Sequence, residues 1–229
     1  MEKIERHFEK ELERLTETIL RLGSHAEGAI VDAVRSLIER DTELALRVIR
    51  RDEEADQLEL EVDQISMDLL ALRQPMARDL RFIITALKIA PELERIGDLA
   101  GNIAERSIEL AEEPQLKAYI DIPLMSDLVR GMVRDSLDAF VRREADTARR
   151  IIARDDQVDA IMEQFFRELL SYMLEDPRNI GRALRLMMVS KYLERVGDGA
   201  TNICEMVVYL TEGRVIRHGG IHPTEAGPD

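Results

Sequence analysis

The residues best suited to chemistry in this chain are carboxylates that recur in pairs four positions apart. Asp52 and Asp56 form one pair, and Glu94 and Asp98 form another. Residues four apart lie on the same face of a helix, so each pair would present two carboxylates side by side. Like charges at this spacing destabilise a helix unless a cation lies between them.

The same pairs occur a second time, about one hundred residues further along the chain. The segment ERIGDLAGNIAE (94–105) matches ERVGDGATNICE (194–205) at eight of 12 positions, and VIRRDEEAD (48–56) resembles IIARDDQVD (151–159). The 17 residues before the first of these segments (77–93) and the 17 before its counterpart (177–193) share only two identities. This pattern indicates an internal duplication in which the carboxylate segments diverged least.

Arginines or metal ions could compensate these carboxylates. Four arginines stand directly beside one of these carboxylates in the sequence: Arg51, Arg95, Arg154 and Arg195. On a helix, however, a neighbouring residue points about 100° away. Oxygen-only ligand sets suit hard cations such as Mg²⁺, Mn²⁺ or Ca²⁺, with iron also possible. We favour metal, and we predict eight ligands: Asp52, Asp56, Glu94, Asp98, Asp155, Asp159, Glu194 and Asp198.

An alternative stays open, in which these carboxylates are solvated faces of surface helices. The apolar residues Ile96, Leu99 and Ile103 lie roughly opposite Glu94 and Asp98, which puts the acidic stripe at the surface of a bundle. We further expect Gly97, Gly101 and Gly197 to mark a close approach by a neighbouring helix, because glycine inside a helix costs about 1 kcal/mol relative to alanine.

Composition narrows the class of protein. The chain has 229 residues, a net charge of −14, 45% hydrophobic residues and a single cysteine. The negative charge argues against nucleic acid as the main ligand, and no apolar run approaches the ~20 residues of a membrane helix. We therefore expect a cytoplasmic, all-α protein without direct membrane insertion.

Apolar residues at three- and four-residue spacing predict long amphipathic helices. We expect helices near residues 2–39, 42–72 and 78–112, with a bend at Pro91, then 124–143, a fifth to about 175 and a sixth to about 212. Asp41 should cap the second helix. The corresponding division is a first three-helix repeat at 1–113, a linker at 114–123, a second repeat at 124–212 and a tail at 213–229.

Enzymatic chemistry finds little support in the residues. The chain has no Glu-x-x-His motif, no histidine lies between residues 26 and 217, and Cys204 replaces Ala104 of the first half as a small core residue. We predict no catalytic or organic-cofactor residue. A carboxylate-bridged metalloenzyme and a metal-free helical adaptor remain as alternative functions.

The stretch Leu69–Leu110 resembles the signature region of the PhoU family, the accessory proteins of the phosphate-specific ABC transporter. It carries LRQP, ALKI and ERIGD in that order, and ERVGDGATNICE fits the same family. The resemblance extends from about Glu5 to Glu212. The chain departs from the family pattern at Pro91 and Glu92, and the second half has LEDPRN where the first has LRQP.

This resemblance implies two tandem three-helix bundles related by an internal repeat, with multinuclear metal clusters at the eight carboxylates named above. The metals would be divalent or trivalent ions such as Fe, Mn, Mg, Zn or Ca. It also implies a cytoplasmic, homodimeric negative regulator of phosphate uptake and phosphate-regulon signalling. The implied partners are the ATPase subunit of the transporter and the phosphate sensor histidine kinase.

Overall fold

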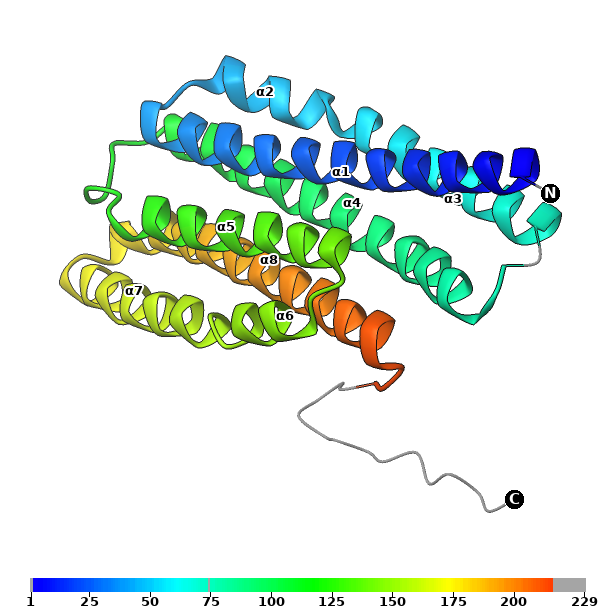
Figure 1. Ribbon diagram of the computed structural model, residues 1–229. Coiled ribbons are helices and arrows are strands. Elements are labelled where there is room, and N and C mark those ends of the chain that lie inside the picture. Colours follow the sequence, from blue (N-terminus) through cyan, green and yellow to red (C-terminus); the bar gives the residue numbers. More distant parts are fainter. Residues whose placement is uncertain (1, 74, 216–229) are drawn as a thin grey trace.

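The computed structural model describes residues 2–73 and 75–215, and the regular structure in these ranges is helical (Figure 1). The elements are α1 (Glu2–Glu39), α2 (Thr42–Arg50), α3 (Asp52–Arg73), α4 (Ala77–Ala111), α5 (Asp121–Arg142), α6 (Ala145–Ile152), α7 (Asp155–Glu175), the 3₁₀ turn η1 (Pro177–Asn179) and α8 (Ile180–Glu212). The predicted all-α fold is confirmed.

The helices form two bundles that lie side by side. In the first bundle α1 and α4 pack together and α2 and α3 cover them; in the second, α5 and α8 pack together and α6 and α7 cover them. The bundles meet where α4 contacts α8 and α1 contacts α5, so a continuous apolar core runs through the molecule. Phe82 of α4 stacks on Phe140 of α5 across this interface, with ring centroids 5.0 Å apart.

Backbone geometry repeats between the halves. Arg40 and Arg143, which stand 103 positions apart and end the first helix of each half, both adopt a left-handed conformation with φ of 57°. In the first half Asp41 follows, and its side chain accepts a hydrogen bond of 2.9 Å from the Leu44 amide. The predicted cap at Asp41 is therefore confirmed.

The second helix of each predicted repeat is divided into two, contrary to our expectation of single helices. Arg51 separates α2 from α3, and Ala153 and Arg154 separate α6 from α7. Each break makes a carboxylate, Asp52 or Asp155, the first residue of a new helix. The positive end of the helix dipole favours negative side chains there, so the breaks help to accommodate the acidic residues that follow.

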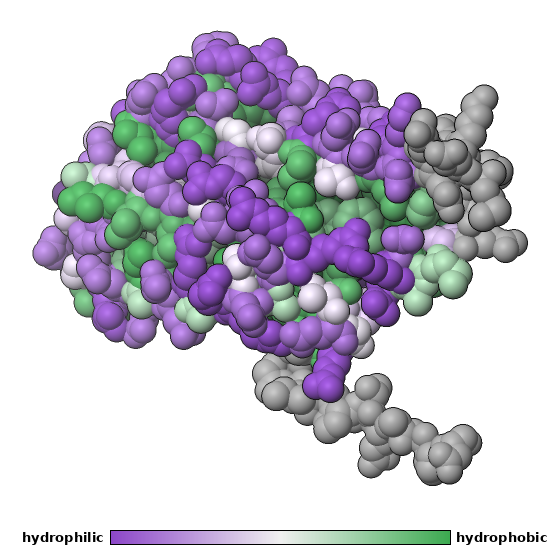
Figure 2. All heavy atoms as spheres, viewed as in Figure 1, coloured by the Kyte–Doolittle hydropathy of each residue, from purple (hydrophilic) through white to green (hydrophobic). Residues whose placement is uncertain are grey.

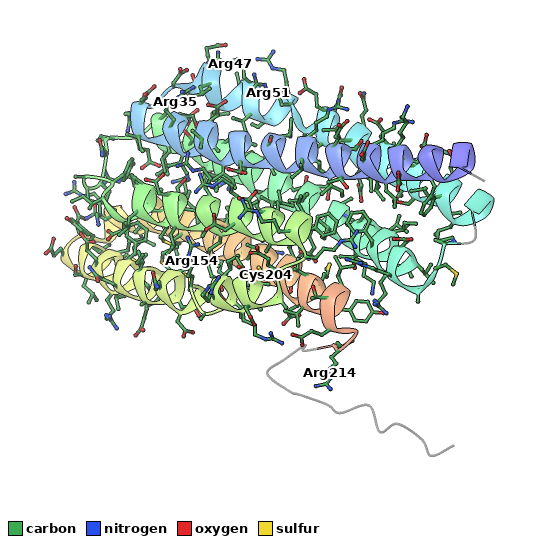
Figure 3. The ribbon with its side chains drawn as sticks, viewed as in Figure 1. Arg35, Arg47, Arg51, Arg154, Cys204 and Arg214 are labelled. Atoms are coloured by element: carbon green, nitrogen blue, oxygen red, sulfur yellow. The ribbon has the colours of Figure 1, made fainter. Side chains whose placement is uncertain are left out.

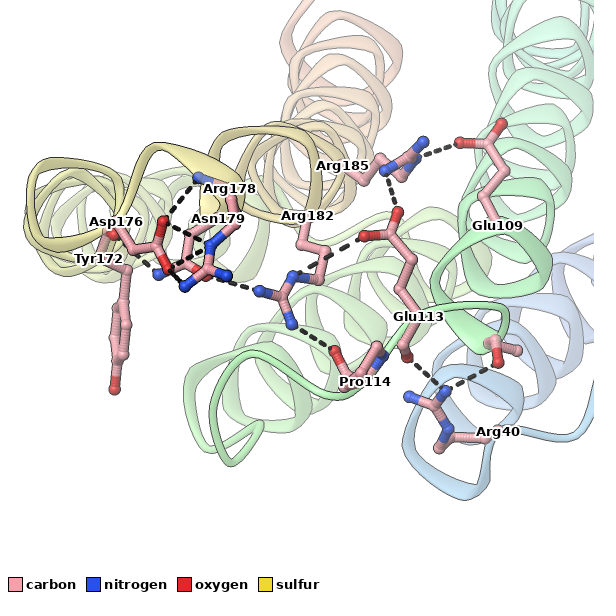
Figure 4. A network of polar contacts seen from close by, with 11 residues as sticks. Arg40, Glu109, Glu113, Pro114, Tyr172, Asp176, Arg178, Asn179, Arg182 and Arg185 are labelled. Carbon is pink, nitrogen blue, oxygen red and sulfur yellow. Dashed lines mark hydrogen bonds and ion pairs between the residues drawn. The ribbon is translucent and has the colours of Figure 1, made fainter.

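The two repeats are joined by a short segment that is held by arginines. Arg40 donates to the backbone oxygens of Ala111 and Glu113 at 2.8 and 2.6 Å, and Arg185 of α8 pairs with Glu109 and Glu113 at 2.8 Å each (Figure 4). Since α5 already begins at Asp121, the connection ends earlier than the predicted 114–123. The division into repeats at 1–113 and 124–212 stays a proposal.

α4 continues through Pro91 as one helix, and the bend expected there stays a prediction. Most of the predicted tail, residues 216–229, lies outside the described residues. In the described part of the chain, no helix combines the length and the apolar character needed to cross a membrane.

Candidate metal centres

Carboxylates from α3 and α4 lie near enough in the first bundle to act on one another electrostatically. The charged groups that act most strongly on Glu94 are the carboxylates of Asp98, Glu59, Asp56 and Asp52. We call this group, together with Asp63, the N-terminal cluster. It unites all four residues predicted as ligands in the first half.

The N-terminal cluster is electrostatically strained. Burial, together with the neighbouring carboxylates, raises the pKa of Glu94 to about 7. Burial and the charges of Asp98 and Asp56 also raise the pKa of Asp52. Both shifts show that negative charge at this place is destabilised by its surroundings. A bound cation would relieve the repulsion.

Glu59 and Asp63 were absent from our predicted ligands. Burial raises the pKa of Glu59, and the charges of Asp63, Asp56 and Asp98 raise it further. The sequence did contain a signal for them, because they follow Asp52 at seven and eleven positions and so continue its helical stripe.

The second bundle contains an equivalent group on α7 and α8, which we call the C-terminal cluster: Asp155, Asp159, Glu194 and Asp198. Burial raises the pKa of Asp155 to about 6, with further contributions from the charges of Asp198, Asp159 and Glu194. Asp155 Oδ1 and Glu194 Oε2 are buried and have no hydrogen-bond partner. Buried oxygens of this kind normally have a partner, so a ligand is expected beside them.

A glycine allows Asp155 to approach α8 closely. A Cβ atom at Gly197 would lie 3.1 Å from Asp155 Oδ1, whereas at Gly97 it would lie 4.0 Å from Asp52 Oδ1. The expected close approach is thus real and tightest at Gly197. It is wrong for Gly101, where a Cβ atom would meet nothing within 4 Å.

The neighbouring arginines do not neutralise the clusters. Arg51 pairs with Asp32 at 3.4 Å, and Arg154 pairs with Asp135 at 2.6 Å, so both guanidinium groups are bound to the first helix of their own repeat (Figure 3). Arg95 and Arg195 make no ion pair within the described part of the chain. Arginine compensation, the alternative to metal, is therefore not supported at these four positions.

One basic side chain does reach a cluster. Lys191, one turn before Glu194 on α8, donates to Glu194 Oε1 at 2.6 Å. The sequence signal was its i, i+3 spacing from Glu194.

A histidine also lies near the N-terminal cluster, although we expected none. Both ring nitrogens of His25 on α1 are buried without a hydrogen-bond partner, and its ring acts electrostatically on Asp52. His25 Nε2 lies 3.5 Å from Glu54 Oε2, where α1 and α3 contact each other. No local pattern could reveal this contact, because it depends on how α1 packs against α3.

The donor sets of both clusters are carboxylate oxygens, which suit a hard cation, and in the C-terminal cluster two of these oxygens are buried and unpartnered. In residues 2–73 and 75–215, however, no three histidine, cysteine, aspartate or glutamate side chains already stand in an arrangement that could hold a metal ion.

Comparison with known proteins decides the family. The model of the PhoU domain matches residues 19–107 and matches again at residues 122–207. The chain belongs to the PhoU family. The two matches cover the two repeats, and each contains one of the carboxylate clusters.

Relatives of the PhoU family are similar over nearly the whole chain. A phosphate-specific transport system accessory protein PhoU homolog from Pseudomonas putida is 43% identical, covering 95% of this chain and 86% of its own length. A homolog of the same name from Aquifex aeolicus is 44% identical, covering 91% and 95%.

Solved PhoU structures share the fold. The crystal structure of PhoU from Pseudomonas aeruginosa is 41% identical, has a TM-score of 0.85 and covers 90% of this chain and 99% of its own. The phosphate transport system regulatory protein PhoU from Streptococcus pneumoniae is 30% identical, with a TM-score of 0.84 and coverage of 91% and 98%. The predicted PhoU-like arrangement of two repeated helical bundles is confirmed.

Proposed function

We propose that this chain is a cytoplasmic accessory protein of a phosphate-specific transport system, that it restrains phosphate uptake and phosphate-regulon signalling, and that it is not an enzyme. It acts by contact with the ATPase subunit of the transporter and with the sensor histidine kinase, as a homodimer. Metal ions held by the N-terminal and C-terminal clusters stabilise the contacting surfaces. The names of its relatives support the link to phosphate transport.

The observation that carries the metal part of this proposal is the unpartnered, buried oxygen of Glu194. The residue is only 9% exposed, and its Oε2 atom has no hydrogen-bond partner, while Lys191 donates to its other oxygen, Oε1. Leaving a buried oxygen without a hydrogen-bond partner costs about 1–3 kcal/mol. A cation at this place removes that cost.

A surface suited to protein contact lies at one end of the second bundle. Phe166, Leu170 and Leu174 are exposed at four-residue spacing on α7, and Leu174 is 79% exposed. Ile120 before α5 and Ile180 at the start of α8 are also exposed. Figure 2 shows apolar side chains reaching the surface at the end of the molecule where α5 begins and α7 ends. Such a stripe is typical of an interaction site.

The experiment that tests this function is a binding assay with the two proposed partners. The metal-loaded chain should retain the ATPase subunit and the cytoplasmic part of the sensor kinase, and chelation should weaken both interactions. Asp98→Ala and Asp198→Ala should weaken them without unfolding the chain. Binding that is absent with both partners, with and without metal, would reject the proposed role.

A metal-free helical adaptor is the second candidate, because no three ligands converge in the described residues. It shares the proposed partners but needs no ion. Elemental analysis of the purified protein separates the two, since the adaptor would contain no bound metal.

A further inference from the structure

The two clusters differ at three positions that the repeat aligns. Glu59 and Asp63 on α3 correspond, 103 residues later, to Met162 and Phe166 on α7. Lys191 on α8 corresponds, 100 residues earlier, to Pro91 on α4. Each difference leaves the first half with more negative charge than the second.

The N-terminal cluster contains the four predicted carboxylates Asp52, Asp56, Glu94 and Asp98; Glu59 also acts on Glu94, and Asp63 acts on Glu59 further along the same stripe. None of these six makes an ion pair within residues 2–73 and 75–215. Arg51, the basic residue beside Asp52, is bound to Asp32 instead. His25 acts favourably on Asp52, but among the described residues it is paired with Glu54 and with none of these six carboxylates.

The C-terminal cluster has four carboxylates and one ammonium group. Lys191 Nζ lies 2.6 Å from Glu194 Oε1, and the lysine side chain is 56% exposed while the glutamate side chain is 12% exposed. On α7, the positions that correspond to Glu59 and Asp63 are occupied by Met162 and Phe166. Met162 packs against the core and adds no negative charge. Asp156 also acts on Asp155, so a fifth carboxylate adds negative charge beside the C-terminal cluster, whereas its counterpart Glu53 is not among the main groups that act on Asp52.

Coulomb's law turns this difference into a difference of affinity. The attraction of a divalent cation grows with the number of carboxylates nearby and falls when a positive group already occupies one of their oxygens. At the C-terminal cluster, a cation must share Glu194 with Lys191 or displace it. At the N-terminal cluster no such competitor is bonded to the carboxylates.

We propose that the two metal centres are unequal, with the N-terminal cluster taking up divalent cations first and more tightly, and with Lys191 acting as a tethered counter-ion that weakens binding at the C-terminal cluster. This inference rests on the proposed function, since it requires metal at both clusters. In metal-poor conditions the protein is half loaded, and the second bundle responds to changes in metal supply.

The test is a titration of the metal-stripped chain with Mn²⁺, in which free Mn²⁺ is measured by electron paramagnetic resonance. Asp198→Asn should retain the tighter class of sites, and Asp98→Asn only the weaker class. In the Asp98→Asn background, Lys191→Gln should tighten binding about tenfold, whereas Lys191→Arg, which keeps the charge, should not. In the Asp198→Asn background, Glu59→Gln should weaken binding by a similar factor.

Each result decides the matter. Equal affinities in the two single-cluster variants, or no response to Lys191→Gln, would overturn the inequality and leave both metal centres standing. If no chain binds Mn²⁺, the metal centres and their inequality both fail. Where a double variant does not fold, Lys191→Gln alone remains decisive, because it should draw together the two affinities seen in the unaltered chain.

Discussion

Lys191 and Glu194 are joined by a hydrogen bond of 2.6 Å across one turn of α8, and the position equivalent to Lys191 in α4 is occupied by Pro91. Two helices that share the motif around ERIGD and ERVGD thus present different charges to their carboxylate clusters. Similarity of motif within the repeat does not make the two clusters equivalent.

The glycines on the two central helices should respond differently to alanine. Gly101→Ala introduces a methyl group into open space and should raise the free energy of unfolding by about 0.5–1 kcal/mol, because alanine is the better helix former. Gly197→Ala should lose this gain, since its Cβ atom would lie 3.1 Å from Asp155 Oδ1. Urea denaturation of both variants checks the prediction, and an equal gain in the two would contradict it.

Stability of the metal-free chain should fall as the pH rises from acidic to neutral. The pKa of Glu94 is raised from 4.5 to about 7, and that of Asp155 from 3.8 to about 6. A carboxyl group that binds its proton more tightly in the folded state adds stability below its unfolded pKa, and this stability is lost as the pH rises through the folded pKa.

Melting curves in the presence of a chelator, recorded from about pH 5 to about pH 8, measure this loss. Glu94→Gln removes one of the two titrating groups and should reduce the slope. A melting temperature of the metal-free chain that increases steadily over the same pH range would show that negative charge at the clusters is not destabilised.

Cys204 should be inert towards thiol reagents in the folded chain. The residue is completely buried in α8, and burial raises its thiol pKa to about 12, so the reactive thiolate is almost absent at neutral pH. A colorimetric thiol assay should detect no reaction in native buffer and one thiol per chain in denaturant. Rapid labelling of the native protein would mean that α8 opens readily.

The apolar stripe on α7 should be required for partner binding. Leu170→Glu places a charge in the centre of this stripe and should abolish capture of the ATPase subunit or of the sensor kinase, with little change in melting temperature, because Leu170 is 44% exposed. Leu60→Glu on α3, where leucine is 66% exposed, is the matched control. Equal loss of binding in both variants would point to a general effect of charge.

Helix positions followed well from the sequence because the apolar spacing and the breaks at proline are local signals. α1 and α8 end at the residues that were predicted, Glu39 and Glu212. The breaks before Asp52 and Asp155 were missed, since neither proline nor glycine marks them. Arg51 itself keeps near-helical angles, φ of −79° and ψ of −6°, so the division depends on how α2 and α3 each pack against α4.

The clusters themselves were predictable to the extent that one helix determines them. Spacing of four placed Glu94 beside Asp98, and the repeat identified the second set. The partnership of Arg51 with Asp32 and the approach of His25 to α3 depend on α1, which lies far from them in sequence. Contacts of this kind are decided by tertiary packing, which spacing within one helix does not report.

Elemental analysis of the purified, desalted chain tests most directly whether metal is bound at the two separate clusters. We predict bound divalent or trivalent metal in the unaltered protein, a partial loss in Asp98→Ala and in Asp198→Ala, and a complete loss when both are combined. Metal-free protein, with a melting temperature that neither chelation nor added Mn²⁺ changes, would contradict this prediction.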